Sequence, residues 1–468
     1  MRLVETDVLV LGAGLAGLRA AWAALDGKRK DQLRVTVAWA GRGPSGSSFA
    51  NRNDGWGLLA PQNDAERERF VSRALEIAPP GRIAPSLLAI LAEESASRLH
   101  ELQSLGIRPL PRSSRVCFAP DLRAAVFRDS HTLFPALAEQ IVARGGVLLP
   151  GVQALTILRR NDTACGALLV DDTGELVLHG ARAVICALGG PAPLFPRHVA
   201  GTENPGTAPA ILAEAGVTLD NLPYLQWMWH DLDSGRFAPI DRLAGGSVSI
   251  GDGETPLPHV FAALAGDRAS HFPRAYDLPS EAMDMHLGRI ACSGDGKGVR
   301  IRQEGASPLR ILPHAHAANG GARIDALGRT NVPGLWACGE CATGMHGANR
   351  LGGAMVAAAL VFGRRAGMNA GIHARQAVPV AEGSELKEFA KLWIENERRN
   401  TSQDVLRPDP HRILRALFLR KTDEARDLLV EFSENKAAHI GIHADSFTKL
   451  IIQLAGGRLR KALPSTAA

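Results

Sequence analysis

The chain has 468 residues, of which 46% are apolar and 22% charged, so it can bury large cores and is not intrinsically disordered. At ~150 residues per domain, this length predicts two or three domains. The net charge of +5 is small, no run of five basic residues occurs, and the six cysteines are too few for a disulfide scaffold, which argues against a nucleic-acid partner and favours a reducing compartment.

The chain begins with a nucleotide-binding pattern. Gly12-Ala-Gly14-Leu-Ala-Gly17 directly follows an apolar strand over 7–11 and precedes a helix over 18–25 and a strand over 33–39. In such a βαβ unit the first glycine permits the turn, the second lets a pyrophosphate approach the backbone, and the third lets the helix pack on the strand. The acid that usually ends the second strand and binds ribose hydroxyls is absent, because this strand ends in Ala38-Trp39-Ala40-Gly41. We therefore predict a dinucleotide site that holds its adenosine through other contacts.

The middle of the chain alternates helices and strands. Residues 231–309 are rich in Gly, Pro and Asp and have little periodicity, so we expect a separate, loop-rich domain inserted into the first. Before it, the sequence predicts a polar Gly-rich loop, three helices, a group of strands with a hairpin turn, and a helix closed by a glycine, over residues 44–57, 64–76, 85–105, 135–144, 151–187, 171–174 and 206–216.

The C-terminal part predicts a hairpin, a short strand, a Gly-rich loop and a long helix, followed after about residue 374 by a small helical domain. The apolar run 351–363 is too short to span a bilayer, and the N-terminus has acids where a signal peptide has none. We expect a soluble, cytoplasmic protein without direct membrane insertion. The predicted elements cover residues 323–328, 335–338, 339–353, 354–369, 384–397, 411–419 and 422–435.

A long segment then resembles a known family. Residues 332–367, VPGLWACGECATGMHGANRLGGAMVAAALVFGRRAG, resemble the C-terminal flavin-binding signature of the fumarate reductase/succinate dehydrogenase flavoprotein family, which includes L-aspartate oxidase. Other family-like segments occur in the same order: DVLVLGAGLAG, ICALGG, the stretch over 206–226, RLAGG over 242–246 and HAANGGARID over 316–325. The resemblance covers roughly residues 5–370.

This resemblance implies the fold and the chemistry. The expected fold is α/β: a Rossmann-like FAD-binding domain over 1–222 and 313–372, an inserted α+β capping domain over 223–312, and a C-terminal helical domain over 373–468. The family transfers a hydride between flavin N5 and a carbon of a small dicarboxylate or amino-dicarboxylate. We therefore expect an FAD-dependent oxidoreductase with a small anionic substrate, and its cap lacks family elements, which points to a substrate other than plain succinate or fumarate.

Several residues match positions that hold the substrate in the family. Arg350 matches the carboxylate-binding arginine, and a guanidinium suits that role because it binds carboxylates bidentately. His316 matches a family histidine, with His314 as the alternative. Arg242 matches the arginine that serves as proton acid or base, although its RLAGG motif lacks the family's glutamate, and Arg274 is the alternative. The loosest match is the histidine of QWMWHDLD, His230.

Other residues match the flavin-binding positions. The loop over 45–57 corresponds to the segment that wraps the isoalloxazine ring, and it has no histidine where relatives with covalent FAD carry one, so we predict non-covalent FAD. Glu340 matches the residue that binds the ribityl chain. Ala354 and Met355 begin a helix whose N-terminus can stabilise negative charge at flavin N1 and C2=O. The expected cofactor contacts, with the glycines of the first motif, are Gly12, Gly14, Gly17, Ser47, Ser48, Ala50, Asn51, Gly55, Glu340, Ala354 and Met355.

Two other functions remain open at this stage. The chain could be the electron-transfer flavoprotein subunit of a complex with an iron–sulfur or quinone-linked partner, or it could bind FAD without turnover. Cys338-Gly-Glu-Cys341 is a CxxC motif that invites a redox-disulfide interpretation, but small residues are usual at these positions of the family. The sequence has no pattern of metal ligands.

Overall fold

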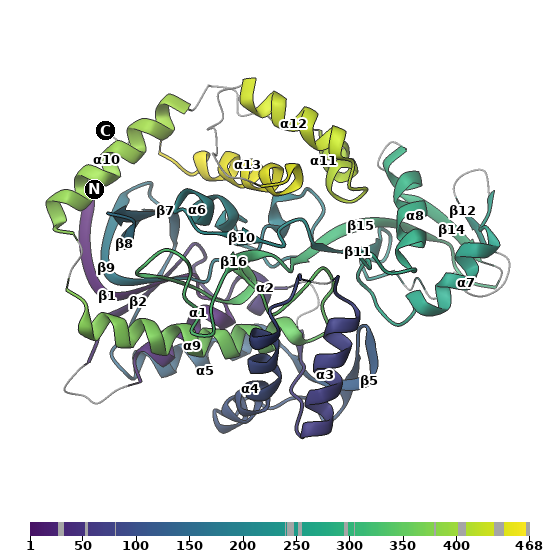
Figure 1. Cartoon of the computed structure of the whole chain (residues 1–468), viewed down its shortest axis with the longest axis horizontal. Helices are drawn as coiled ribbons and strands as arrows, with labels where there is room; N and C mark the ends of the chain where they lie inside the picture. Colours follow the sequence, from purple (N-terminus) through teal and green to yellow (C-terminus); the bar gives the residue numbers. More distant parts are fainter. Residues whose placement is uncertain are drawn as a thin grey trace.

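The structure is a computed structural model of the chain. It describes every residue except 27–31, 52–54, 80, 239, 241–247, 251–254, 294–297, 304, 379–380, 401–408, 435–443 and 465–468. Figure 1 shows a large central sheet, with a group of helices along one side and a smaller group of helices and strands projecting at one end.

The central sheet is the scaffold of the nucleotide site. Its strands lie in the order β6-β2-β1-β9-β8-β7, and β17 pairs with β9. The pairs β1–β2, β1–β9, β2–β6 and β9–β17 are parallel, whereas β7–β8 and β8–β9 are antiparallel. Because β1 is central, its carboxyl end opens at the middle of the sheet edge. The strand bounds are Arg2–Leu11 (β1), Val35–Trp39 (β2), Val147–Pro150 (β6), Val152–Arg160 (β7), Thr163–Asp171 (β8), Leu176–Cys186 (β9) and Leu335–Ala337 (β17).

Two helices cover the sheet behind the glycine motif. α1 (Leu15–Ala24) and α9 (Ala354–Gln376) pack so closely that a methyl group built on Gly367 would lie 2.0 Å from the Ala20 carbonyl oxygen. Only glycine allows backbones to approach this closely. Small residues on α9 therefore fix the place of its N-terminus beside the nucleotide site. On the same side, α5 (Leu133–Val142) packs on α1 and α4 (Pro85–Ser104) packs on α9, with α3 (Asp64–Glu76) against α4. Helix α6 (Ala208–Glu214) packs instead on β7 and α13 (Ser446–Arg460).

The segment between β11 and β15 is more regular than the sequence predicted. These two antiparallel strands lead out of and back into the large domain, and they continue into β14, β12 and β13. Instead of a loop-rich domain, the structure has two helices here, because Met283, Leu287 and Ala291 recur at four-residue spacing between flanks rich in Gly and Asp. The bounds are Leu225–Asp231 (β11), Val248–Ile250 (β12), Thr255–Pro256 (β13), His259–Arg268 (α7), Glu281–Ser293 (α8), Val299–Gln303 (β14) and Leu309–Ala318 (β15).

The C-terminal helices share a second hydrophobic core with this inserted segment. Phe418 lies between two tryptophans of β11, with ring centroids 5.7 Å from both Trp227 and Trp229. The last helix was not predicted from the sequence. No helix within the described residues is long and apolar enough to cross a membrane. The helices, which Figure 1 shows along the upper side, are Gly383–Asn400 (α10), Pro410–Leu417 (α11), Thr422–Glu434 (α12) and Ser446–Arg460 (α13).

Short elements complete the surroundings of the nucleotide site. The helix α2 (Gly46–Phe49) lies in the polar loop that follows β2. The strands β3 (Gly55–Leu58), β4 (Ser113–Val116) and β5 (Ala119–Arg128) form a small antiparallel sheet. A third sheet joins β10 (Leu219–Asp220), β16 (Gly321–Arg323) and β18 (Ala342–Thr343). These elements confirm the expected α/β class, with a Rossmann-like domain, an inserted α+β segment and C-terminal helices.

Candidate active site

The three glycines of the first motif have three different surroundings. Gly12 has φ +106°, and a methyl group on it would lie 2.3 Å from the Ala187 carbonyl oxygen. A methyl group on Gly17 would lie 1.9 Å from the Gly12 carbonyl oxygen, so this glycine is required for packing. Gly14 has an ordinary φ of −68°, and its added methyl group would contact only Ser48 Oγ, at 3.4 Å. The protein therefore leaves open the side of Gly14 that a pyrophosphate would approach.

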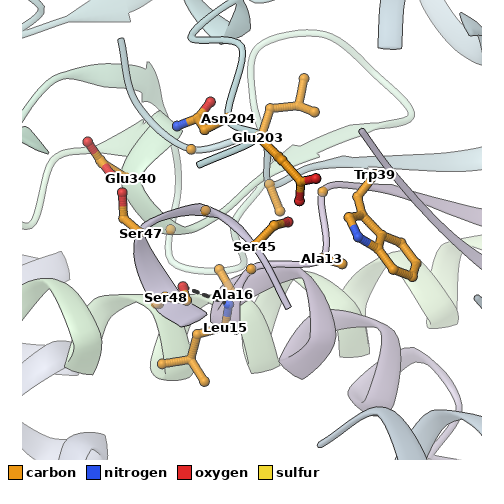
Figure 2. Close-up of a pocket in the computed structure, with 18 of the residues that line it drawn as sticks. Ala13, Leu15, Ala16, Trp39, Ser45, Ser47, Ser48, Glu203, Asn204 and Glu340 are labelled. Carbon is orange, nitrogen blue, oxygen red and sulfur yellow. Dashed lines mark hydrogen bonds between the residues drawn. The ribbon is translucent and has the colours of Figure 1, made fainter. Parts of the chain in front are cut away.

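A pocket lies directly beside this glycine turn (Figure 2). Gly12, Gly14, Ser47 and Ser48 line it, whereas Gly17 does not and packs against the Gly12 backbone. Ser48 Oγ accepts a hydrogen bond from the backbone N–H of Leu15 at 3.0 Å, which ties α2 to the start of α1. The Ser47 hydroxyl accepts one from the N–H of Gly201 at 3.3 Å.

A second cavity, of about 720 Å³, continues from the first. The two share Ser47, Trp56, Glu340, Met355 and Val356. Asn51 and Gly55 line only the second cavity, whereas Ala50 and Ala354 line neither. Since α9 begins at Ala354, its positive end lies where the cavities meet. Two connected cavities, one beside a glycine turn and one beside a helix N-terminus, fit the two halves of a flavin adenine dinucleotide.

Arg350 is a buried cation at the wall of the second cavity. Arg350 is only 7% exposed. Its Nε donates a hydrogen bond to Asn319 Oδ1 at 3.0 Å, and its Nη2 donates one to Gln226 Oε1. Both acceptors are neutral amides, and among the described residues no carboxylate oxygen lies within 4.0 Å of the guanidinium. Burial lowers the pKa of Arg350 to about 10, so the group still carries its charge at neutral pH. The charge is thus solvated by amides and is not neutralised by a paired carboxylate.

Glu340 is a buried acid at the junction of the cavities. Its Oε1 accepts a hydrogen bond from the backbone N–H of Ala318 at 2.9 Å. Burial raises the pKa of this carboxyl, while that hydrogen bond and the charge of Arg350 act in the opposite direction. The carboxylate is held in place by the 3₁₀ turn Gly339–Cys341, which follows β17.

The predicted histidines occupy different layers. His316 lines the second cavity, and its Nδ1 is buried without a hydrogen-bond partner among the described residues. Burial, followed by the charges of Arg350 and His230, lowers the pKa of His316 to about 3, so it is neutral at pH 7. His230 does not line the cavity: its ring stacks on that of His314, with centroids 4.5 Å apart, and its centroid lies 4.7 Å from that of Phe237. The ring centroids of Phe237 and His316 are 6.2 Å apart, edge to face.

Of the two candidate arginines of the inserted segment, the structure describes only Arg274. Arg242 lies outside the described residues, so its predicted role is untested. Arg274, the alternative, is buried away from the cavity: its Nε donates to Glu281 Oε1 at 3.1 Å, and its Nη1 donates to the Phe418 carbonyl oxygen. These contacts tie the inserted segment to the C-terminal helices.

Sequence reasoning missed several residues that line the cavities. Arg115 of β4, Arg128 of β5 and Arg112, which directly precedes β4, contribute exposed cations to the second cavity. In the first pocket, Glu203 and Asn204 come from the loop after β9. The Arg-Ser-Ser-Arg stretch over 112–115 was a visible polar signal in the sequence, whereas nothing near Glu203 marked it.

The CxxC motif does not form a pair in this structure. Cys338 and Cys341 are both buried free thiols. The sulfur of Cys341 lies 3.9 Å from that of Cys186, and the Cys341 thiol donates to the Cys186 and Cys338 carbonyl oxygens at 3.2 and 3.3 Å.

Comparisons with known proteins agree with this geometry. A family model described as FAD dependent oxidoreductase matches residues 7–283, and one described as FAD binding domain matches residues 262–356. A fumarate reductase (CoM/CoB) subunit from Methanothermobacter marburgensis is 27% identical over 415 residues, which cover 79% of this chain and 73% of that protein. L-aspartate oxidase from Halobacterium salinarum is 27% identical over 418 residues, which cover 82% of this chain and 79% of that protein.

Solved structures share the fold. The Sdh1 complex of Mycobacterium smegmatis contains a chain with a TM-score of 0.73 and 21% identity, and the match covers 100% of this chain and 88% of that one. A quinol fumarate reductase from E. coli gives a TM-score of 0.70 and 19% identity, and covers 99% and 88%. The chain therefore belongs to the FAD dependent oxidoreductase family, is similar to fumarate reductase and L-aspartate oxidase flavoproteins, and has FAD as its cofactor.

Proposed function

We propose that this enzyme transfers a hydride between its flavin and a small dicarboxylate or amino-dicarboxylate of the succinate, fumarate or aspartate type. The observation that carries the proposal is Arg350, a buried and charged guanidinium at the cavity wall whose hydrogen-bond partners are neutral amides. A buried charge is costly unless an opposite charge or several hydrogen bonds compensate it. A substrate carboxylate supplies that missing charge and matches the geometry of the guanidinium fork.

The other lining residues support an anionic substrate. Three further arginines, Arg112, Arg115 and Arg128, line the same cavity, whereas Glu340 is its one acidic residue within the described part of the chain. Cations at the wall raise the local concentration of anions and favour their entry. The cavity is therefore suited to a molecule with more than one carboxylate.

The proposed roles of the individual residues follow from their places. Arg350 holds one carboxylate, and neutral His316 donates or accepts a hydrogen bond through its unpartnered Nδ1. His230 supports His316 from the layer behind Phe237. We retain Arg242 as the proposed proton acid or base. When bound, FAD supplies the hydride acceptor or donor.

We propose that FAD is held without a covalent bond. In this proposal Gly12, Gly14 and Ser48, which line the first pocket, would contact the dinucleotide. Glu340 and Met355, which line both cavities, would hold the junction of the ribityl chain and the ring. We also retain the domain division, with residues 223–312 as the cap, although the second hydrophobic core joins this segment to the C-terminal helices.

A second candidate function is that of an electron-transfer flavoprotein within a larger complex. It is favoured because one similar protein is a component of fumarate reductase (CoM/CoB), and because similar structures come from a succinate dehydrogenase complex and a quinol fumarate reductase. Co-purification of a stoichiometric iron–sulfur or quinone-linked partner with the chain from its own cells would support this function.

The direct test is the visible spectrum of the FAD-loaded enzyme without oxygen. Succinate, L-aspartate and related diacids are added one at a time, and fumarate is added to the dithionite-reduced enzyme. We expect one diacid to bleach the flavin or fumarate to reoxidise it, while butyrate, which has a single carboxylate, does neither. A flavin that no diacid reduces and fumarate does not reoxidise would overturn the proposal.

A further inference from the structure

We propose that Glu203 is the carboxylate that binds the ribose hydroxyls of the FAD adenosine, in place of the acid that is missing at the end of β2. In dinucleotide-binding folds that acid stands at the carboxyl end of the second strand. Here β2 ends at Trp39, and the next two residues, Ala40 and Gly41, carry no carboxylate. The adenosine end of the pocket would then have no acceptor for the ribose hydroxyls from its own strand.

The structure brings a carboxylate to this point from elsewhere in the chain. A methyl group built on Gly41 would lie 2.4 Å from Glu203 Oε2 and 2.6 Å from Ser45 Oγ. Both oxygens therefore converge on the residue two positions after the end of β2. Glu203 also lines the same pocket as Trp39 and Ala40.

The two ends of the pocket can be told apart, and Glu203 lies at the end opposite the flavin. Its flavin end is the one that it shares with the second cavity, at Glu340 and Met355. In Figure 2, Glu340 and Trp39 lie on opposite sides of the pocket, and Glu203 lies on the side of Trp39. The glycine turn between them takes the pyrophosphate. Glu203 is thus at the end that only the adenosine half of the cofactor reaches.

The loop around Glu203 is held firmly. The backbone N–H of Gly46 donates to the Thr202 carbonyl oxygen at 2.8 Å. On the other side, Asn204 donates through Nδ2 to the Gly190 carbonyl oxygen at 3.3 Å and accepts from the N–H of Gly206 at 2.9 Å. Glu203 itself has φ +63°, a left-handed conformation that is unfavourable for a residue with a side chain. The fold keeps a strained residue at a point where its carboxylate enters the pocket.

The carboxylate is free to accept from a ligand. No hydrogen bond or ion pair joins Glu203 to another residue in the described part of the chain, and the cation nearest in sequence to this corner, Arg42, pairs with Asp172. An ionised carboxylate can accept from two neighbouring hydroxyls at once, as a ribose diol requires.

The test measures cofactor binding by the apoprotein, from flavin fluorescence, with three ligands. These are FAD, FAD whose adenosine ribose lacks its 2′-hydroxyl, and FMN, which has no adenosine. Glu203→Gln is expected to weaken FAD binding about 10-fold, the effect of one hydrogen bond to a charged group, and to leave FMN binding unchanged. The wild type should bind the deoxy cofactor about 10-fold more weakly than FAD. Glu203→Gln should bind the deoxy cofactor and FAD with equal affinity.

Two further variants complete the design. Glu203→Asp withdraws the carboxylate by one methylene and is expected to weaken FAD binding in the same selective way. Glu68→Gln makes the same chemical change on the exposed surface of α3 and should bind all three ligands as the wild type does. The proposal is overturned if Glu203→Gln binds FAD within twofold of the wild type, or if it weakens FMN and FAD equally. No diacid enters these measurements, so the result is independent of the proposed substrate.

Discussion

Substituting alanine for either of two glycines in the first motif should separate folding from cofactor binding. At Gly17 the added methyl group would lie 1.9 Å from the Gly12 carbonyl oxygen, whereas 3.4 Å is an ordinary contact, so α1 must move by about 1.5 Å from the turn. The obstacle is backbone, which cannot rotate away. We expect Gly17→Ala to lower the free energy of unfolding by ~3 kcal/mol, the upper part of the range for overpacked cores.

At Gly14 the same change should leave the fold intact. The backbone there has φ −68° and ψ 176°, which alanine adopts without strain, and the methyl group meets only Ser48 Oγ at 3.4 Å. Stability should stay within ~1 kcal/mol of the wild type and can rise, because alanine restricts the unfolded chain. The methyl group nevertheless occupies the side that a pyrophosphate approaches, so we expect FAD affinity to fall at least ~10-fold.

Both variants are measured as apoproteins by urea unfolding and then titrated with FAD. The expected pattern is reciprocal: Gly17→Ala loses stability, and Gly14→Ala keeps stability but loses FAD affinity. A Gly14→Ala variant that binds FAD normally, or a Gly17→Ala variant as stable as the wild type, would refute the assignment of separate roles to these glycines.

Two predictions concern pH. Because the pKa of His316 is lowered to about 3 in the folded enzyme, from 6.5 when unfolded, the unfolded chain binds the extra proton between these values and the apoprotein loses stability as the pH falls below 6.5. His316→Gln should therefore lose less thermal stability than the wild type between pH 7 and pH 5, and an equal loss would contradict this. Glu214 accepts hydrogen bonds from Thr156 and Trp393, and burial raises its pKa to about 7. The stability that the protonated carboxyl contributes to the folded protein is therefore lost as the pH rises from 4.5 through 7. Glu214→Gln should raise the unfolding temperature at pH 8 but not at pH 4, and the opposite order would show that the burial argument is wrong.

The elements predicted best from the sequence have strong local signals. The helix over 64–76 was placed correctly, because Asn63 caps it: the side chain of Asn63 accepts from the backbone N–H of Glu66. The βαβ unit and the long helix after residue 353 were also predicted. Helix α13 was missed, although Asp445 caps it in the same manner, accepting from the N–H groups of Phe447 and Thr448.

The residues missed at the site are those that the fold brings from distant segments. Glu203 lies in the loop after β9, yet its carboxylate reaches the end of β2 because these segments converge at the same edge of the sheet. Arg112, Arg115 and Arg128 line the cavity from a small sheet and the residue before it, and these strands have no motif. Such positions depend on topology, and no local pattern in the sequence encodes them. Arg350 was identified because a long family-like segment surrounds it.

The most direct test of the proposed function is the affinity of Arg350 variants for a diacid that does not react. Malonate is titrated into the FAD-loaded enzyme, and its binding is followed by the perturbation of the flavin spectrum. Because Arg350 is the buried charge that a carboxylate would neutralise, Arg350→Gln should raise the malonate Kd about 100-fold, and Arg350→Lys should restore only part of the affinity. Arg69→Gln, on the exposed face of α3, is the control of equal charge change and should bind malonate normally. Equal malonate affinity in Arg350→Gln and the wild type, at equal FAD occupancy, would contradict the proposal that this cavity binds a dicarboxylate through Arg350.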